Sequence, residues 1–121
     1  ISPNWAVFVG QGTIRKEVMG LENRDPTASE LSKMKLMVKE AMEEGALGIS
    51  TGLFYVPGSF SSTSEVIELS KVAARYGGIY ISHMRDEAVD ILKSINETIN
   101  IGIKAKIPVQ ITHHKIIGKE N

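Results

Sequence analysis

The segment GGIYISHMRDE, residues 77–87, contains the pattern that decides the fold. Two glycines precede a short apolar run at residues 79–82. His83 follows the run directly, and three charged residues stand at positions 85–87. A run of this length is too short for a helix, and glycines before it are typical of a turn into a buried strand. The segment therefore predicts a strand whose carboxyl end carries polar side chains.

Three further runs, at residues 6–9, 47–50 and 109–112, have the same character. Amphipathic helices are predicted between the strands, because apolar residues recur there at helical spacing. Two of these helices begin after sequences of the capping type, at residues 27–30 and 62–65, and a third is expected from about Ala88 to Ala105. A short helical turn is expected at residues 13–19.

The resulting order is β-α-β-α-β-α-β. Ile49, Ile81 and Ile111 occupy equivalent points of three successive strands, 32 and 30 residues apart, which is the length of one β-α unit. Strands joined by covering helices lie parallel, and two architectures fit: part of a (β/α)8 barrel, or a small doubly wound sheet. In both of them ligands bind at the carboxyl ends of the strands.

Composition narrows the class of protein. The chain has 121 residues, enough for one hydrophobic core, and we expect residues 1–121 to form a single segment. The 14 basic and 14 acidic residues balance, so neither nucleic acid nor an anionic membrane is an expected partner. The sequence contains no cysteine, no apolar run long enough to span a bilayer and no visible signal peptide, which makes the cytoplasm the expected compartment.

The ends of the sequence indicate a piece of a longer protein. The first residue is not Met, and the chain stops soon after the strand-like run at residues 109–112. A barrel that is cut in this way exposes strand edges, which tend to pair with another chain. We therefore expect the isolated segment to self-associate.

The three histidines all follow predicted strands. His83 follows the third strand, and His113 and His114 follow the fourth. Counting alternate positions places His83 on the face of Ile81 and His113 on the face of Ile111, so two neighbouring strands should direct matching imidazoles into one space. Neutral imidazole is the usual nitrogen ligand of Zn²⁺. One such histidine is more often a hydrogen-bonded core residue, but two at equivalent positions favour a metal site.

Other polar residues gather at the same strand ends. Tyr55, in the loop at residues 50–58, could polarise a substrate carbonyl or could only pack the loop. Lys115 could hold a substrate carboxylate or be a solvated surface lysine. Asp86 and Glu87 could orient a ligand histidine, but a favourable charge at the start of the next helix is the preferred interpretation, and Arg85 could simply pair with them.

Three stretches together resemble one known family: GALGISTGLFYVPG at residues 45–58, GGIYISHMRDE at 77–87 and VQITHHKIIGKEN at 109–121. They are similar to N-acyl-D-amino-acid deacylases, or D-aminoacylases, of the amidohydrolase superfamily. NWAVFVGQGTIR, at residues 4–15, resembles the segment that precedes them in that family. The likeness covers nearly the whole chain in the family's order and spacing.

The resemblance implies part of a (β/α)8 barrel of the TIM type and a zinc-dependent hydrolase that cleaves the amide bond of N-acyl-D-amino acids, with one or two zinc ions. By motif, His83 and His113 match metal ligands, Tyr55 matches a tyrosine near the scissile carbonyl, and Lys115 matches a lysine that holds the substrate carboxylate. Arg85 is carried over as a further substrate-binding candidate, and His114 is not expected to be a ligand.

The family also uses a His-x-His pair, a cysteine ligand and an aspartate that shuttles protons, and none of these can be placed in this sequence. They are expected before residue 1 and beyond residue 121, so the segment alone should be inactive. Two alternatives stay open: a cyclic amide hydrolase of the dihydroorotase or hydantoinase kind, and a non-catalytic α/β fragment that only self-associates.

Overall fold

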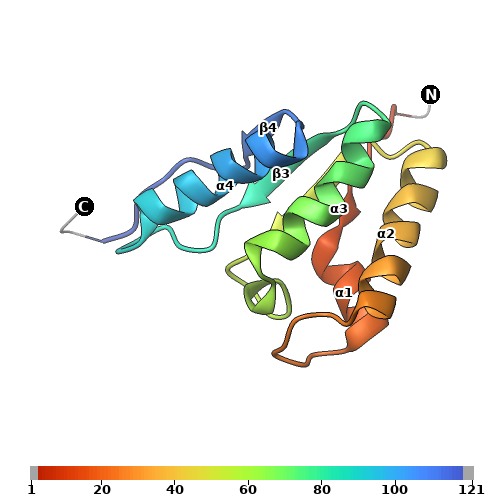
Figure 1. Cartoon of the computed structure of the whole chain (residues 1–121). Helices are drawn as coiled ribbons and strands as arrows, with labels where there is room; N and C mark the ends of the chain where they lie inside the picture. Colours follow the sequence, from red (N-terminus) through yellow and green to blue (C-terminus); the bar gives the residue numbers. More distant parts are fainter. Residues whose placement is uncertain (1–2, 119–121) are drawn as a thin grey trace.

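The computed structural model describes residues 3–118 and contains a four-stranded parallel sheet (Figure 1). Residues 1–2 and 119–121, which include the end of the third motif, lie outside the described part. The strands lie side by side in chain order, without a switch point among the described residues, as in the wall of a barrel. They are β1 (Val9–Gly10), β2 (Gly48–Gly52), β3 (Ile79–His83) and β4 (Val109–Ile111).

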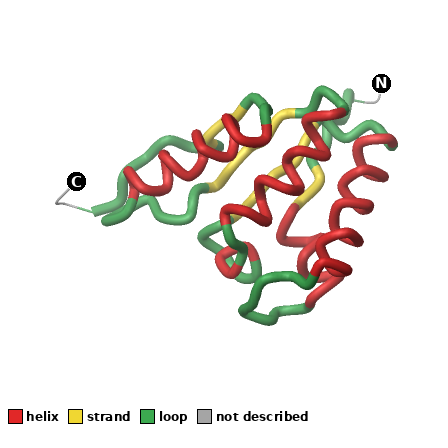
Figure 2. Tube along the Cα trace, viewed as in Figure 1, coloured by secondary structure: helices red, strands yellow, loops and turns green. Residues whose placement is uncertain are grey.

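Helices connect the strands and pack on the sheet (Figure 2). The strong signals for helix starts are confirmed: Thr27 and Glu30 form a capping box before α2, and the Ser62 hydroxyl accepts the Glu65 N–H before α3. Some bounds differ from expectation: α1 is longer than a turn, α4 begins at Ile91, and the strand expected at residues 6–9 is found only at Val9–Gly10. The helices are α1 (Gln11–Met19), α2 (Ala28–Glu43), α3 (Thr63–Arg75) and α4 (Ile91–Ala105), with a short 3-10 helix, η1 (Gly58–Phe60).

The core lies between the sheet and this helical layer. Ile49 of β2 and Tyr80 of β3 are paired in register and fully buried, and they pack in one cluster with Val66 and Leu69 of α3. Along β3 burial alternates: Tyr80 and Ser82 are buried, and Ile79, Ile81 and His83 are half-buried. The helices therefore cover one face of the sheet, and His83 lies on the other.

The register corrects the parity argument. Ser82 of β3 pairs with Ile111, and Ile81 pairs with Gln110. Paired residues of parallel strands point to the same side, so Ile111 lies on the face opposite to Ile81. Counting alternate residues from Ile111 is thus the wrong reason to place His113 beside His83.

A buried polar cluster joins α1 to α3. The guanidinium of Arg15 is fully buried against the Glu65 carboxylate and also donates to the backbone oxygen of Arg24 at 2.5 Å. The Gln11 amide donates to Glu65 at 2.8 Å and to the hydroxyl of Ser61 at 2.6 Å. These contacts satisfy a buried charge and fix α1 against the turn that precedes α3. No helix in residues 3–118 has the length and apolar character of a membrane span.

Candidate metal centre

His83 and His113 meet at the carboxyl end of the sheet. His83 is the last residue of β3, and His113 lies two residues beyond β4. Their ring centroids are 4.4 Å apart and their planes cross at 78°. The convergence of the two imidazoles, which the positions of the strand ends predict, is therefore present.

The path of the chain after β4 brings His113 to this place. The N–H of Thr112 still donates to the Ser82 oxygen at 2.9 Å, and the chain then leaves the strand direction. Farther on, the N–H of Ile117 donates to the backbone oxygen of Glu87 at 2.7 Å. The segment after β4 is thus attached to the loop after β3, which holds the second histidine over the first.

Glu87 supplies a third donor group. Its side chain is only 4% exposed, and its Oε1 lies 2.8 Å from Nδ1 of His113 and 3.8 Å from Nε2 of His83. Its Oε2 lies 3.6 Å from the Lys115 ammonium. The expected role of Glu87 at a helix N-terminus is wrong, because α4 begins four residues later, at Ile91.

The three side chains fit a cation. One ligand atom from each of His83, Glu87 and His113 can be chosen so that all lie within 4.8 Å of one another. Although Oε1 of Glu87 and Nδ1 of His113 are close, neither has a hydrogen bond to any group in residues 3–118, and both are buried. A buried carboxylate oxygen facing an unpaired imidazole nitrogen is costly unless a proton or a metal ion lies between them. Two imidazoles and a carboxylate are donors that Zn²⁺ accepts.

The electrostatics favour the form of His83 that binds metal. Burial lowers the pKa of His83 below its ordinary value; the Glu87 carboxylate opposes this shift, and His113 and Lys115 add to it. A lower pKa keeps the imidazole neutral at physiological pH, with a nitrogen lone pair available for a metal ion.

Tyr55, in the loop after β2, lies against His83. Its ring centroid is 5.0 Å from that of His83, and the Phe54 ring packs edge-on against Tyr55 at 5.2 Å. The side chain is 58% exposed, so the phenol faces open space beside the histidines. A groove lined in part by Thr13, Lys16 and Tyr55 runs along the ends of β1 and β2.

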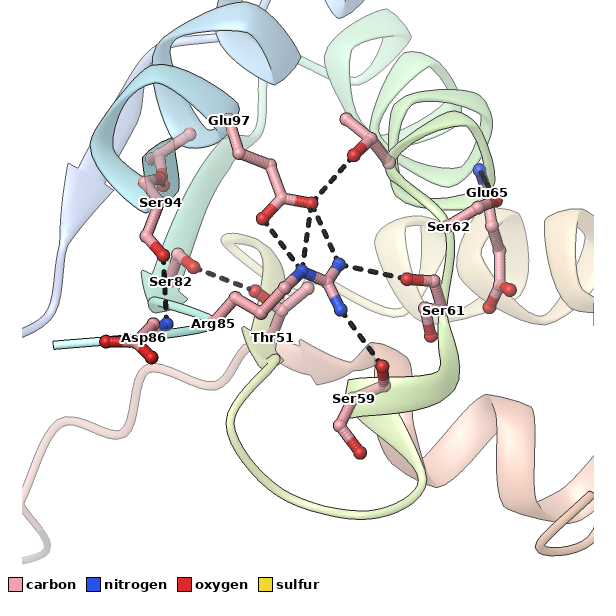
Figure 3. Close-up of polar contacts among 12 residues, drawn as sticks. Thr51, Ser59, Ser61, Ser62, Glu65, Ser82, Arg85, Asp86, Ser94 and Glu97 are labelled. Atoms are coloured by element: carbon pink, nitrogen blue, oxygen red, sulfur yellow. Dashed lines mark hydrogen bonds and ion pairs between the residues drawn. The ribbon is translucent and has the colours of Figure 1, made fainter. Parts of the chain in front are cut away.

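Arg85 contacts the protein itself (Figure 3). Its guanidinium donates to the Glu97 carboxylate of α4 and to the backbone oxygens of Ser59 and Ser61. Pairing with Asp86 and Glu87, the simple expectation, is not the arrangement found. Substrate binding by Arg85 stays a prediction. His114 is exposed to solvent.

From the sequence, Glu87 could be a partner of a histidine, but a role at the start of the next helix was the preferred prediction. The spacing of four residues from His83 carries no helical information, because the chain between them is irregular. The contact with His113 depends on the fold of residues 112–118, which no local pattern describes. The available signal was a carboxylate in the short loop that follows the first histidine, four residues after it.

Comparison with curated proteins finds three relatives from Alcaligenes xylosoxydans xylosoxydans. A D-aminoacylase is 43% identical over 118 residues, which are 98% of this chain and 24% of that protein. An N-acyl-D-aspartate deacylase is 39% identical over 115 residues, and an N-acyl-D-glutamate deacylase is 33% identical over 118. The chain spans about a quarter of the length of these relatives. No protein-family model matches it.

Solved structures agree in fold. A D-aminoacylase described as defining a novel subset of amidohydrolases superposes with a TM-score of 0.92 at 43% identity, covering 96% of this chain and 24% of that one. An N-acyl-D-glutamate deacylase from Bordetella bronchiseptica, in complex with zinc and a phosphonate inhibitor, gives the same score and coverage at 34% identity. A further D-aminoacylase structure is described as containing a binuclear metal center. These matches confirm the family resemblance and the expected fold class, a parallel α/β segment of a larger barrel.

Proposed function

Because this chain is a segment homologous to D-aminoacylases over nearly its whole length, we propose that the complete protein hydrolyses the amide bond of N-acyl-D-amino acids in a zinc-dependent reaction. The observation that carries the proposal is the convergence of His83, Glu87 and His113 at the end of the sheet where such folds bind ligands. The activities for which the relatives are named favour linear N-acyl amino acids over cyclic amides.

His83 and His113 would supply two nitrogen ligands to the metal. Glu87, buried against both rings, would balance the charge of the ion and fix the ring of His113. When bound, zinc supplies Lewis-acid polarisation of the amide and a bound water of lowered pKa. The remaining ligands, and the aspartate that shuttles protons, are expected outside this segment.

Tyr55 and Lys115 would orient the substrate. The phenol of Tyr55 lies beside the His83 ring with its face open, so its hydroxyl can donate to a carbonyl oxygen held near the metal. Lys115, half exposed at 3.6 Å from Glu87, has an ammonium that can turn to a substrate carboxylate. Fixing both ends of the substrate reduces the entropy lost on reaching the transition state. Arg85 remains a candidate for a further substrate contact.

The partners and the compartment of the protein are proposed from its sequence. The substrate is a small molecule, no nucleic acid or membrane partner is proposed, and the cytoplasm is the proposed compartment. Residues 1–121 alone are proposed to be inactive, because the general acid and base, worth about 10²–10⁴-fold in rate, is expected elsewhere in the protein.

Assays of the purified, zinc-loaded complete protein test this function. N-acetyl-D-amino acids, hydantoins and dihydroorotate are compared as substrates, with N-acetyl-L-amino acids as the stereochemical control. We expect turnover of the D-compounds, its loss on metal removal by a chelator and recovery on return of zinc, and its loss in His83→Ala. Turnover of hydantoins or dihydroorotate alone, or full activity in His83→Ala, would contradict the proposal.

A further inference from the structure

Arg85 connects the strand of His83 to the loop that carries Tyr55. It lies two residues beyond His83, and its side chain is about one-third exposed. Nη1 donates to the Ser59 oxygen at 3.0 Å and Nη2 to the Ser61 oxygen at 2.9 Å, so one guanidinium holds two carbonyls of the η1 turn (Figure 3).

The backbone of Ser59 passes this restraint to Tyr55. Its N–H donates to the backbone oxygen of Tyr55 at 2.8 Å, while its own oxygen accepts from Arg85. At the other side, the N–H of Tyr55 donates to the oxygen of Gly52, the last residue of β2, at 3.1 Å. The backbone of Tyr55 is therefore tied to the end of β2 on one side and to Arg85 on the other.

Glu97 of α4 holds the guanidinium in place. It accepts from Nη2 of Arg85 at 2.8 Å and from Nε at 3.0 Å, and it also accepts the Thr63 hydroxyl at 2.7 Å. The η1 turn is fixed from the opposite direction by Gln11, whose amide donates to the Ser61 hydroxyl. Bidentate pairing with a carboxylate while two carbonyls are bound needs the planar fork of arginine, which lysine lacks.

The ring of Tyr55 depends on this backbone restraint. The side chain is 58% exposed, and its ring contacts are with Phe54 of the same loop and with His83. A ring with so little packing is placed mainly by its backbone. Displacing a catalytic group by about 1 Å can cost on the order of 10²-fold in rate.

We propose that Arg85, held by Glu97, is a positioning residue that sets the hydroxyl of Tyr55 against the histidine pair. This inference rests on the proposed function, in which Tyr55 polarises the substrate carbonyl. It assigns Arg85 a role through Tyr55 in place of a direct contact with substrate, and it gives a reason for the Arg85 of the SHMRDE motif to lie so near a metal ligand.

A double-mutant cycle in the complete, zinc-loaded protein tests the inference. Arg85→Lys is expected to lower kcat about 10- to 100-fold, with KM changed less than about threefold and zinc content unchanged. In a Tyr55→Phe background the same substitution should cost less than about threefold, because the hydroxyl that it displaces is already gone. Glu97→Gln should lower kcat in the same direction by a smaller factor, which provides a second variant if Arg85→Lys folds poorly.

Arg24→Lys is the matched control, because Arg24 makes a similar two-point pair with Glu30 on the exposed start of α2. Its kcat should stay within about twofold of wild type. Equal losses from Arg85→Lys in both backgrounds would overturn the inference. A raised KM with unchanged kcat would also overturn it, in favour of direct substrate binding.

A measurement independent of turnover separates this inference from the proposed function. With 3-fluorotyrosine at position 55, the fluorine resonance should shift or broaden in Arg85→Lys and match wild type in Arg24→Lys. An unchanged resonance in Arg85→Lys would overturn the positioning role. If the wild-type protein hydrolyses no N-acyl-D-amino acid, the proposed function fails, and the resonance still decides whether Arg85 positions Tyr55.

Discussion

Glu87 lies between the two histidines, so the geometry of the candidate metal centre depends on one buried carboxylate. Its oxygens contact His113 at 2.8 Å, Lys115 at 3.6 Å and His83 at 3.8 Å. A carboxylate beside a ligand imidazole fixes the orientation of the ring and raises its basicity. The charge of Glu87, and not its shape alone, should therefore matter for metal binding.

Glu87→Gln keeps the size of the side chain and removes this charge. We expect the zinc affinity of the complete protein to fall about 10- to 100-fold, measured by competition with a chromophoric chelator. Asp86→Asn is the adjacent control, because Asp86 accepts from the N–H of Ala88 and makes no ion pair with either ligand histidine in the described structure. Equal zinc affinity in Glu87→Gln and Asp86→Asn would show that the charge of Glu87 has no role in metal binding.

At the scale of residues, the sequence predicts the meeting of His83 and His113, because both follow neighbouring parallel strands. The parity argument fails because β4 pairs one residue out of the assumed register, with Ser82 opposite Ile111. The contact of Glu87 with His113 could not be predicted from local pattern, since it requires the hydrogen bond between Ile117 and the Glu87 backbone. Long-range contacts of irregular segments leave little periodic signal in sequence.

At the scale of elements, α1 and α3 depend on the buried pair of Arg15 and Glu65. Burial raises the pKa of Glu65 above its ordinary value of 4.5, against the opposing effects of Arg15 and Gln11. Removing one partner of a buried ion pair leaves the other charge without compensation. Removing one partner of this pair should therefore cost far more stability than breaking an exposed pair on a helix surface.

Arg15→Met should lower the free energy of unfolding of the complete protein by about 3–5 kcal/mol, measured by urea denaturation. Lys35→Met, which breaks the partly exposed pair with Glu68, is the control and should cost no more than about 1 kcal/mol. Equal losses of unfolding free energy in the two variants would show that burial of the Arg15–Glu65 pair does not increase the cost of breaking it.

The deficit of Arg15→Met should also depend on pH. Without Arg15 the folded-state pKa of Glu65 rises further above its unfolded value, so the folded state binds the extra proton. The stability of Arg15→Met therefore falls as the pH rises from 4.5, the ordinary pKa of a glutamate, through the higher pKa of Glu65 in the folded state. The difference between Arg15→Met and wild type should accordingly shrink in urea titrations below that ordinary value, and a deficit that grew with acidity would contradict the assignment.

Element starts were predictable where capping residues mark them. Thr27 with Glu30 and Ser62 with Glu65 mark α2 and α3 within one residue, because their side chains bond to the first free N–H groups. No side chain in the described part of the chain caps α4, and its start lies three residues after the expected one. The loop that contains Glu87 continues to Asp90, so the residues that were expected to form the first turn of α4 are not helical.

At the scale of the molecule, the alternation of strands and helices along the chain was predictable and the choice of architecture was not. Repeats of about 30 residues indicate parallel β-α units in both a barrel and a doubly wound sheet. The observed order β1-β2-β3-β4, together with the superposition on D-aminoacylase, decides for part of a barrel. The curvature and closure of a barrel arise from all of its strands. The periodicity of a segment that spans about a quarter of the relatives' length therefore cannot reveal them.

The isolated segment should self-associate. β1 and β4 are the outer strands of the described sheet, and unpaired strand edges tend to pair with other chains. Light scattering over a range of concentrations should give a mass above the 13.2 kDa of one chain. A monomer at every concentration would contradict this expectation.

The central claim is that His83 and His113 bind the same metal ion. Anomalous diffraction at the zinc edge from crystals of the complete protein measures this directly. We expect a zinc peak at about 2.0–2.1 Å from one nitrogen of each ring, and loss of that peak in His83→Ala and in His113→Ala. A peak that contacts neither ring, or one that persists unchanged in both variants, would contradict the account.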